Sequence, residues 1–260
     1  MSSEDVNEWS WGKHVRGAPA RPGATGGGKA LHWPFLVPIP AALAVVAHPD
    51  DESFGLGALL AGLVERGTQV SLLCFTHGER STRSDPGEDL GRRRASELEA
   101  AADRLGLCSV TLLDFLDGTL SSFPEGRLDQ EIEETLGFAT TLVVFEPSGV
   151  TGHPDHRAVT AAAERVAVRW GLNLLEWGIG MEVATSLNRE FRTDFIAFVP
   201  GPSCAVLDVD RSAQAEAIAC HQSQVEHNPV VARRLELQGD RELIHWLPAV
   251  ALFRLSRRPP

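Results

Sequence analysis

A short apolar run that leads straight into a cluster of polar residues decides the fold: residues 43–55 read LAVVAHPDDESFG. The run Leu43–Ala47 is continuous and consists of leucine, alanine and valine, which is typical of a strand buried on both faces of a parallel sheet. Four side chains that can bind metals or protons follow at once: His48, Asp50, Asp51 and Glu52. The stretch therefore predicts a first strand that ends at a chemically active turn.

Similar apolar runs recur downstream and alternate with segments of helical spacing. Further strands are expected at Val70–Phe75, Val110–Leu113, Leu142–Phe145 and, less regularly, Leu172–Leu175. Apolar residues three or four apart predict helices over 56–63, 95–105, 128–136 and 159–170. Glycine just after the first two, at Gly67 and Gly106, is the usual left-handed stop. This alternation predicts an α/β fold: a Rossmann-like, doubly wound, mostly parallel sheet with helices on both faces.

The two ends of the chain depart from that pattern. Residues 1–38 include the stretch RGAPARPGATGGG and are predicted to form a flexible arm, with residues 39–260 as a single domain. After about residue 180 we expect a mixed C-terminal elaboration of that domain. Its predicted elements are strands at Phe195–Val199, Cys204–Val209 and Val250–Leu255 and a helix over 211–223.

Composition narrows the range of partners. The 260 residues carry a formal net charge of −11, which disfavours nucleic acid and an anionic membrane surface, so a small-molecule partner is expected. The four cysteines lie far apart without a C-x-x-C pair, and the sequence has no signal segment and no apolar run of membrane-spanning length. These features favour a cytoplasmic location and carry no information on the oligomeric state.

A second polar cluster, GHPDHRA at residues 152–158, follows the fourth predicted strand. In an open parallel sheet, ligands bind beyond the carboxyl ends of the strands, where the strand order reverses. If the strand order is 3-2-1-4, the first and fourth strands are neighbours at that point. We therefore expect the two polar clusters, about 105 residues apart in sequence, to face each other across one crevice.

The residue types in the two clusters suit a catalytic zinc ion or another divalent transition metal. His48, Asp51 and His156 can supply the three protein ligands of such a site, which leaves one position for water. Asp50 is then the candidate general base. His153 is the candidate to stabilise the oxyanion or to assist proton transfer to the leaving nitrogen of an amide. The sequence thus predicts a metal-dependent amide hydrolase.

Each cluster also has a purely structural interpretation. His-Pro-Asp is a common turn, and Asp155 after Pro154 can simply place a negative charge at a helix N-terminus. A non-catalytic Rossmann-like module that binds a nucleotide is a further alternative. That module needs a glycine-rich turn after the first strand, whereas the carboxylates of Asp50, Asp51 and Glu52 would repel a phosphate.

The paired motifs AHPDDE (47–52) and GHPDH (152–156) resemble the signature of the PIG-L/LmbE-like family of zinc-dependent N-deacetylases. Shorter segments extend this resemblance over about residues 41–225: FTHGE (75–79), RRRASEL (92–98), DFLDG (114–118) and HQSQ (221–224). The resemblance implies removal of an acetyl group from an N-acetylglucosamine-type sugar conjugate. Some members of the family instead cleave amides of mercapturic-type thiol conjugates, which is the alternative activity.

The resemblance also implies roles for individual residues. It agrees with zinc ligation by His48, Asp51 and His156, with Asp50 as the base and with His153 as an assistant. It further implies substrate contacts for Arg94 and Asp117 and a site position for His221. Each of these three has an alternative: a charged helix face, a turn before Gly118 and a helix cap, respectively. Certain relatives carry a tyrosine just before the second motif, whereas this chain contains no tyrosine and has Thr151 near that place.

Overall fold

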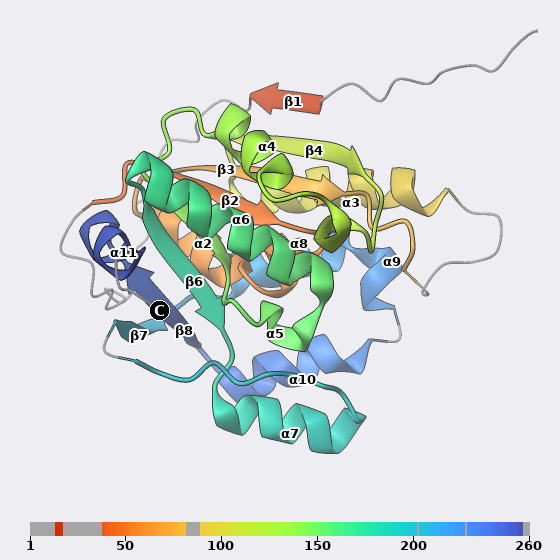
Figure 1. Ribbon diagram of the computed structural model, residues 1–260. Coiled ribbons are helices and arrows are strands. Elements are labelled where there is room, and N and C mark those ends of the chain that lie inside the picture. The colour runs from red at the N-terminus through yellow and green to blue at the C-terminus, as the bar shows by residue number, and fades with distance from the viewer. Residues whose placement is uncertain (1–13, 18–37, 82–88, 202, 227, 257–260) are drawn as a thin grey trace, which may run out of the picture.

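The computed structural model describes residues 14–17, 38–81, 89–201, 203–226 and 228–256, whose strands form one sheet (Figure 1). Within these residues the sheet order is β1-β4-β3-β2-β5-β6-β8-β7. The strands are β1 His14–Gly17, β2 Ala41–Val46, β3 Gln69–Thr76, β4 Ser109–Phe115, β5 Thr141–Phe145, β6 Asn173–Gly178, β7 Cys204–Asp208 and β8 Arg241–Leu247. The five strands predicted before residue 180 coincide with β2 to β6.

The pairing of the strands brings the two polar clusters to one edge. β2 is parallel to both of its neighbours, with Val46 opposite Cys74 on β3 and Ala44 opposite Val143 on β5. β4 and β6 continue the parallel arrangement on either side, and β1, β8 and β7 add antiparallel edges. The predicted 3-2-1-4 order is therefore confirmed, and the carboxyl ends of β2 and β5 are adjacent where the order reverses.

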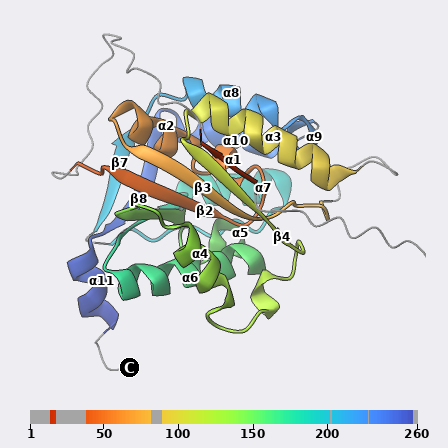
Figure 2. The same ribbon diagram turned by 90° about the horizontal axis from the view of Figure 1, so that it is seen from above.

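Helices cover both faces of the sheet, as Figure 2 shows. One face carries α2 (Gly57–Glu65), α3 (Leu90–Leu105) and α8 (Ser212–Cys220), and the other carries α4 (Arg127–Thr135), α6 (Pro154–Trp170) and α11 (Ala249–Ser256). The remaining helical segments are α1 (Asp51–Phe54), η1 (Leu120–Ser122), α5 (Gly149–Gly152), α7 (Met181–Phe191), α9 (Gln222–Val225) and α10 (Pro229–Gln238). Along β2, Ala44 and Val46 enter the first apolar cluster, and Leu43 and Val45 enter the second. Burial on both faces explains why this strand has no polar position.

Two long helices begin just beyond the carboxyl ends of central strands. α3 starts behind Asp89, whose side chain accepts the backbone N–H of Arg92 at 3.2 Å, and it ends at Gly106 in the left-handed conformation. α6 starts behind His153 with Pro154 in its first turn. Because each helix follows a parallel strand, its first turn faces the same edge of the sheet as the polar clusters.

Two predictions for the C-terminal third are wrong. Residues 195–199 form no strand: the Ile196 N–H donates to Val150 and the Phe198 N–H donates to Ile179, so no single partner strand is available for a ladder. Residues 250–255 belong to helix α11, which packs on α6. A short apolar run is compatible with either a strand or a buried helix, and here the helix covers the open end of the second core. The helix predicted over 211–223 is divided at His221 into α8 and α9.

Most of the predicted flexible arm, residues 1–38, lies outside the described residues. Within it, His14–Gly17 pair with β4 as an antiparallel edge strand. Among the helices that the structure describes, none has both the length and the apolar character needed to cross a bilayer.

Candidate active site

Three predicted metal ligands converge beyond the ends of β2 and β5. His48 Nδ1 lies 3.2 Å from His156 Nε2, and His156 Nε2 lies 3.2 Å from Asp51 Oδ1. The third edge, from His48 Nδ1 to Asp51 Oδ2, measures 3.7 Å. In a tetrahedral site with bonds of about 2.0–2.2 Å, neighbouring ligand atoms stand roughly 3.3–3.6 Å apart. The two contacts of Asp51 are made by different carboxylate oxygens, so the three side chains gather at distances close to those of such a site.

Hydrogen bonds with neighbouring groups orient the side chains of His156 and Asp51. His156 Nδ1 lies 3.0 Å from the carbonyl oxygen of Gly149, which can only accept, so Nδ1 carries the proton and Nε2 keeps a free lone pair. Asp51 Oδ2 accepts the backbone N–H groups of Ala47 at 3.2 Å and His48 at 3.0 Å. These contacts fix the Asp51 carboxylate at the end of β2 before any ligand arrives.

Two carboxylates stand behind His48. Its Nε2 lies 3.0 Å from Asp117 Oδ1 and 3.4 Å from Asp155 Oδ2, although neither contact has the direction of a hydrogen bond. A carboxylate on the far side of a ligating imidazole favours the tautomer with its proton on that side. Nδ1 of His48 is then left with a lone pair toward Asp51 and His156.

The charges around the three ligands favour a cation. Burial opposes charge on His48, yet Asp117, Asp155 and Asp51 raise its pKa to about 10. Burial likewise opposes charge on Asp51, but His156 and His48 hold the pKa of this carboxyl below its usual range. The pKa of His156 is raised, against burial, by Asp51. The three carboxylates thus favour positive charge on the imidazoles. A divalent cation bound between these groups would balance the same negative charge.

Asp50, which directly precedes Asp51 in the chain, has an uncommon backbone conformation, with φ 116° and ψ −27°. Its Oδ2 lies 3.0 Å from Arg94 Nη2, and the same guanidinium donates to the carbonyl oxygens of Pro49 and, at 2.8 Å, Gly78. Burial raises the pKa of Asp50 to about 6 although Arg94 acts to lower it. A carboxylate with a pKa near the working pH is suited to general base catalysis.

His153 closes the other side of the site. Its ring centroid lies 4.9 Å from that of His48 and 5.0 Å from that of His156. Its Nδ1 accepts the backbone N–H of Asp155 at 3.2 Å, so a proton on this neutral imidazole is carried by Nε2. Burial and the nearby His156 and His48 lower the pKa of His153, which keeps it neutral.

Donor atoms in this region form two further close groups. One ligand atom each from His48, His153 and His156, or from His48, Asp117 and Asp155, can be chosen within 4.8 Å of one another. The second group uses His48 Nε2, on the side of the ring away from His156. The first differs from the predicted set only in replacing Asp51 by His153.

The predicted substrate residues are engaged by protein groups. Arg94 is buried against Asp50 and two carbonyl oxygens, and Asp117 faces His48 while its other oxygen accepts the N–H of Arg80 at 3.0 Å. His221 is completely buried, and its Nε2 lies 2.6 Å from Glu52 Oε1. The structure therefore brings Arg94 and Asp117 to the predicted base and ligand, and connects His221 to the turn through Glu52.

The HQSQ segment fastens the C-terminal helices to this region. Ser223 donates its N–H and its hydroxyl to Glu97 at 2.9 and 2.6 Å, and Gln224 accepts the hydroxyl of Ser81 at 2.8 Å. Glu97 lies one helical turn after Arg94 on α3. The two motifs far apart in sequence therefore meet as a structural joint behind the turn that follows β2.

Sequence reasoning missed the part that Asp155 plays. This carboxylate is fully buried and accepts the N–H groups of Gly118 at 2.8 Å and Leu120 at 2.9 Å, besides facing His48. It thereby attaches the loop after β4 to the start of α6. Its position between His153 and His156 was the available signal, but a charge at a helix N-terminus explained it equally well.

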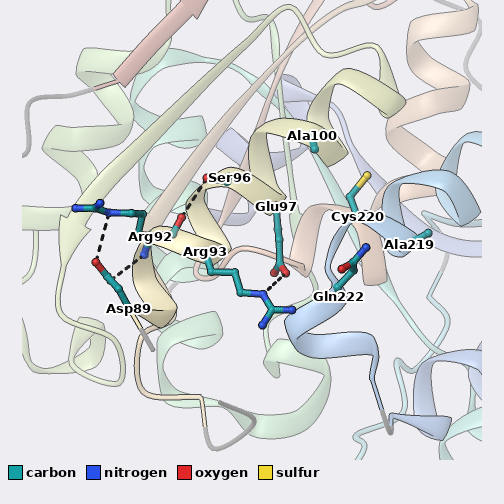
Figure 3. Close-up of a pocket in the computed structure, with 9 residues that line it drawn as sticks. All are labelled: Asp89, Arg92, Arg93, Ser96, Glu97, Ala100, Ala219, Cys220 and Gln222. Atoms are coloured by element: carbon teal, nitrogen blue, oxygen red, sulfur yellow. Dashed lines mark hydrogen bonds and ion pairs between the residues drawn. The ribbon is translucent and has the colours of Figure 1, made fainter. Parts of the chain in front are cut away.

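A separate cavity of about 720 Å³ opens between α3 and the α8–α9 junction (Figure 3). Its lining residues are Asp89, Arg92, Arg93, Ser96, Glu97, Ala100, Ala219, Cys220 and Gln222. Several of these already pair with one another, as in the contact between Arg93 Nε and Glu97 Oε1 at 3.1 Å. None of the three converging donors lines this cavity, so it is distinct from the candidate active site.

Comparisons with known proteins find similar sequences and folds. The family model PIG-L, described as GlcNAc-PI de-N-acetylase, matches residues 43–167. A 1D-myo-inositol 2-acetamido-2-deoxy-alpha-D-glucopyranoside deacetylase of Mycobacterium sp. (strain JLS) is 27% identical, with 74% of this chain and 76% of the relative covered. The N-acetylglucosaminyl-phosphatidylinositol de-N-acetylase of Bos taurus is 26% identical over 84% of this chain and 83% of its own length.

Solved structures share the fold at lower identity. The A40926 pseudoaglycone deacetylase Dbv21 is 22% identical with a TM-score of 0.61, covering 80% of this chain and 96% of that one. The N,N'-diacetylchitobiose deacetylase of Pyrococcus horikoshii is 20% identical with a TM-score of 0.57, covering 82% and 85%. With both signature motifs at the switch point of this sheet, residues 43–167 form a domain of the PIG-L family.

Proposed function

We propose that this chain is a zinc-dependent hydrolase that removes the acetyl group from the nitrogen of an N-acetylglucosamine-type conjugate. The substrate class follows the names of the relatives, which include deacetylases of a glucosaminyl-inositol and of N-acetylglucosaminyl-phosphatidylinositol. The metal follows from the chemistry of the donor set. Among the structural neighbours, a teicoplanin deacetylase has been solved in a zinc-inhibited form.

The observation that carries the proposal is the approach of two imidazoles and one carboxylate. His48 Nδ1 lies 3.2 Å from His156 Nε2, Asp51 Oδ1 lies 3.2 Å from His156 Nε2, and Asp51 Oδ2 lies 3.7 Å from His48 Nδ1. Two imidazoles and one carboxylate are ligands that zinc prefers, and three protein ligands leave a position for water. The alternative set with His153 is less suitable, because Asp51 would then remain a buried carboxylate among the ligands without binding the cation.

Each chain residue has a distinct part in the reaction. When bound, zinc would polarise the acetamide carbonyl and lower the pKa of a water molecule to about 7. Asp50 accepts a proton from the attacking water and returns it to the nitrogen as the C–N bond breaks, which yields acetate and a free amine. His153 donates Nε2–H to the carbonyl oxygen while negative charge builds there. Asp117 and Asp155 orient His48.

The proposal is tested by measuring metal content and acetate release in the same sample, over a panel of N-acetylglucosaminides. One zinc per chain and release of acetate are expected, with loss of both after chelation and recovery on adding zinc. His48→Ala and His156→Ala should each lose metal and activity together. His245→Ala is the matched control, because His245 also pairs with a buried carboxylate, at 2.9 Å, but lies on β8, three strands from β2. A purified chain that binds no metal at these residues contradicts the proposal.

A further inference from the structure

Asp50 is one of only three non-glycine residues with positive φ among the described residues. At φ 116° its side chain crowds the neighbouring backbone, so this conformation persists only where surrounding contacts hold it. In this conformation the carboxylate of Asp50 lies 3.0 Å from Arg94 Nη2. What holds the peptide of Asp50 in this state therefore determines where the proposed base stands.

Glu52 provides that contact. Its Oε2 accepts the backbone N–H of Asp50 at 2.9 Å, two residues back along the chain. Its Oε1 accepts from Ser53 Oγ at 2.6 Å and lies 2.6 Å from His221 Nε2. The side chains of Glu52 and His221 are both 0% exposed, so no water competes for these bonds. One carboxylate thus connects the strained peptide to a histidine 169 residues away in sequence.

His221 is itself held firmly. It stands at the junction of α8 and α9, where its carbonyl oxygen accepts the N–H groups of Gln224 and Val225, both at 2.9 Å. The edge of its ring meets the ring of Phe54 with centroids 5.8 Å apart. Ser223 anchors the same junction to Glu97 on α3. The position of Glu52 is therefore fixed from the C-terminal third of the chain.

We infer that the buried Glu52–His221 pair positions Asp50 for catalysis by holding its backbone in the left-handed conformation. Arg94 holds the carboxylate end of Asp50, and Glu52 holds the peptide end. This role rests on the proposed function through the assignment of Asp50 as the base. It makes Glu52 and His221 positioning residues, which act through Asp50 without touching substrate or metal.

Glu52→Asp is the decisive variant, because it keeps the charge but is too short to reach both Asp50 and His221. We expect kcat to fall about 10- to 100-fold, with KM within about twofold and one zinc per chain retained. Glu52→Gln should recover most of the rate, because its amide oxygen can accept from Asp50 while its NH₂ donates to His221. His221 can take the required tautomer, since its Nδ1 has no hydrogen-bond partner in the described part of the protein.

Asn188→Ala is the matched control, because it removes part-buried hydrogen bonds to the Phe195 backbone in the same third of the chain without touching Glu52, His221 or Asp50. Its kcat should match that of the wild type. If Glu52→Asp fails to fold, His221→Asn breaks the same contact from the other side and carries the same expectation. A wild-type kcat in Glu52→Asp, or an equal loss in Asn188→Ala, overturns the inference.

A crystal structure of Glu52→Asp gives a readout that does not depend on activity. The φ of Asp50 should leave the left-handed region in this variant and remain there in Glu52→Gln. If the wild type releases no acetate from any substrate, the proposed function fails, while the φ of Asp50 still decides the positioning role. An unchanged left-handed Asp50 in Glu52→Asp overturns that role whatever the activity.

Discussion

At the scale of single residues, Asp50 is placed between opposing influences. Burial and the adjacent carboxylates of Asp51 and Glu52 raise its pKa, and Arg94 and His221 act to lower it, with a result of about 6. A carboxyl group in this range is ionised at neutral pH and still basic enough to accept a proton from water. The surroundings of Asp50 therefore match its proposed task better than those of Asp51, whose pKa is held low.

Asp50→Asn should separate metal binding from turnover. The carboxamide keeps the size of the side chain but cannot accept a proton, so kcat should fall about 10²- to 10⁴-fold. The zinc content should stay at one per chain, because His48, Asp51 and His156 are unchanged. Turnover measured beside elemental analysis checks this. Activity equal to the wild type would remove Asp50 from the role of base.

The pH profile of kcat/KM provides a second test of Asp50. Protonated Asp50 cannot act as a base, so the rate should fall as the pH drops through the pKa of this carboxyl. That pKa is about 6 without a bound cation, and a nearby divalent ion lowers it, so the acid limb should lie at or below pH 6. The limb should disappear from the residual activity of Asp50→Asn, and its persistence there would assign it to another group.

Asp117→Asn tests whether this residue serves the metal or the substrate. Its Oδ1 lies 3.0 Å behind His48, so removing its charge should weaken zinc binding about 10- to 100-fold. KM, measured with saturating zinc, should change little. Competition with a zinc-binding dye gives the metal affinity. An unchanged zinc affinity with a raised KM would instead support the substrate contact that the family resemblance implies.

At the scale of secondary-structure elements, strands were easiest to predict from the sequence where helices cover both of their faces. β2, β3 and β5 are covered on both faces, so their apolar runs were recognisable, as was the left-handed stop of α3 at Gly106. β8 escaped prediction because its sequence, RELIHWL, contains a charged residue at a buried position. Glu242 is fully buried there, and Arg211 and Trp177 satisfy it from elsewhere in the chain. Such compensation is invisible in a local pattern.

The same limit applies to the candidate site. The proximity of His48, Asp51 and His156 could be predicted, because each follows a recognisable strand and the strand order brings the strands together. The partners of Glu52 and Asp117 could not, because they depend on the course of α8, α9 and the loop after β4. A motif indicates which residues gather, and only the packing of distant elements decides which of them touch.

Gly78 lies just after β3, and its carbonyl oxygen accepts a hydrogen bond from Arg94 on α3. This contact permits a test at the scale of elements. Gly78 has φ 62°, and a Cβ there would collide with the guanidinium of Arg94. Gly78→Ala should displace Arg94 from Asp50 and lower kcat about tenfold or more, with metal retained. Gly67→Ala is the matched control, because Gly67 has φ 85° but no atom within 4 Å of the added Cβ. Both variants should lose about 1 kcal/mol of stability, and only Gly78→Ala should lose activity.

At the scale of the whole molecule, the proposed metal site and the antiparallel extension occupy different parts of the sheet. Its carboxyl edge at β2 and β5 gathers the metal-facing residues, while the antiparallel strands β8 and β7 extend it on the side of β6. The C-terminal third is therefore more than a cover for the core. Through α8 and α9 it reaches back to the turn after β2, and through α11 it completes the core under α6.

A pair of carboxyl groups, the buried Glu176 and the partly buried Glu164, should link global stability to pH. Burial and the mutual charge with Glu176 raise the pKa of Glu164 on α6 to about 7. Burial and the charge of Glu146 raise that of Glu176 on β6 to about 7 as well. The neighbouring His245 does not offset this, because burial lowers its own pKa. These groups lie outside the proposed metal ligands, so their titration is a property of the fold.

The sign of the effect follows from proton binding in the two states. Between about pH 4.5 and pH 7 the unfolded chain releases protons from Glu164 and Glu176 that the folded chain keeps. The free energy of unfolding should therefore decrease as the pH rises through this interval. Glu176→Gln removes one of the titrating groups, so at pH 8 it should be more stable than the wild type by about 2 kcal/mol. The difference should shrink toward zero near pH 4.5.

Urea unfolding at several pH values measures this difference in stability, with the exposed Glu65→Gln as the control. Parallel pH dependences in the wild type and Glu176→Gln would mean that Glu176 is ionised in the folded protein at neutral pH.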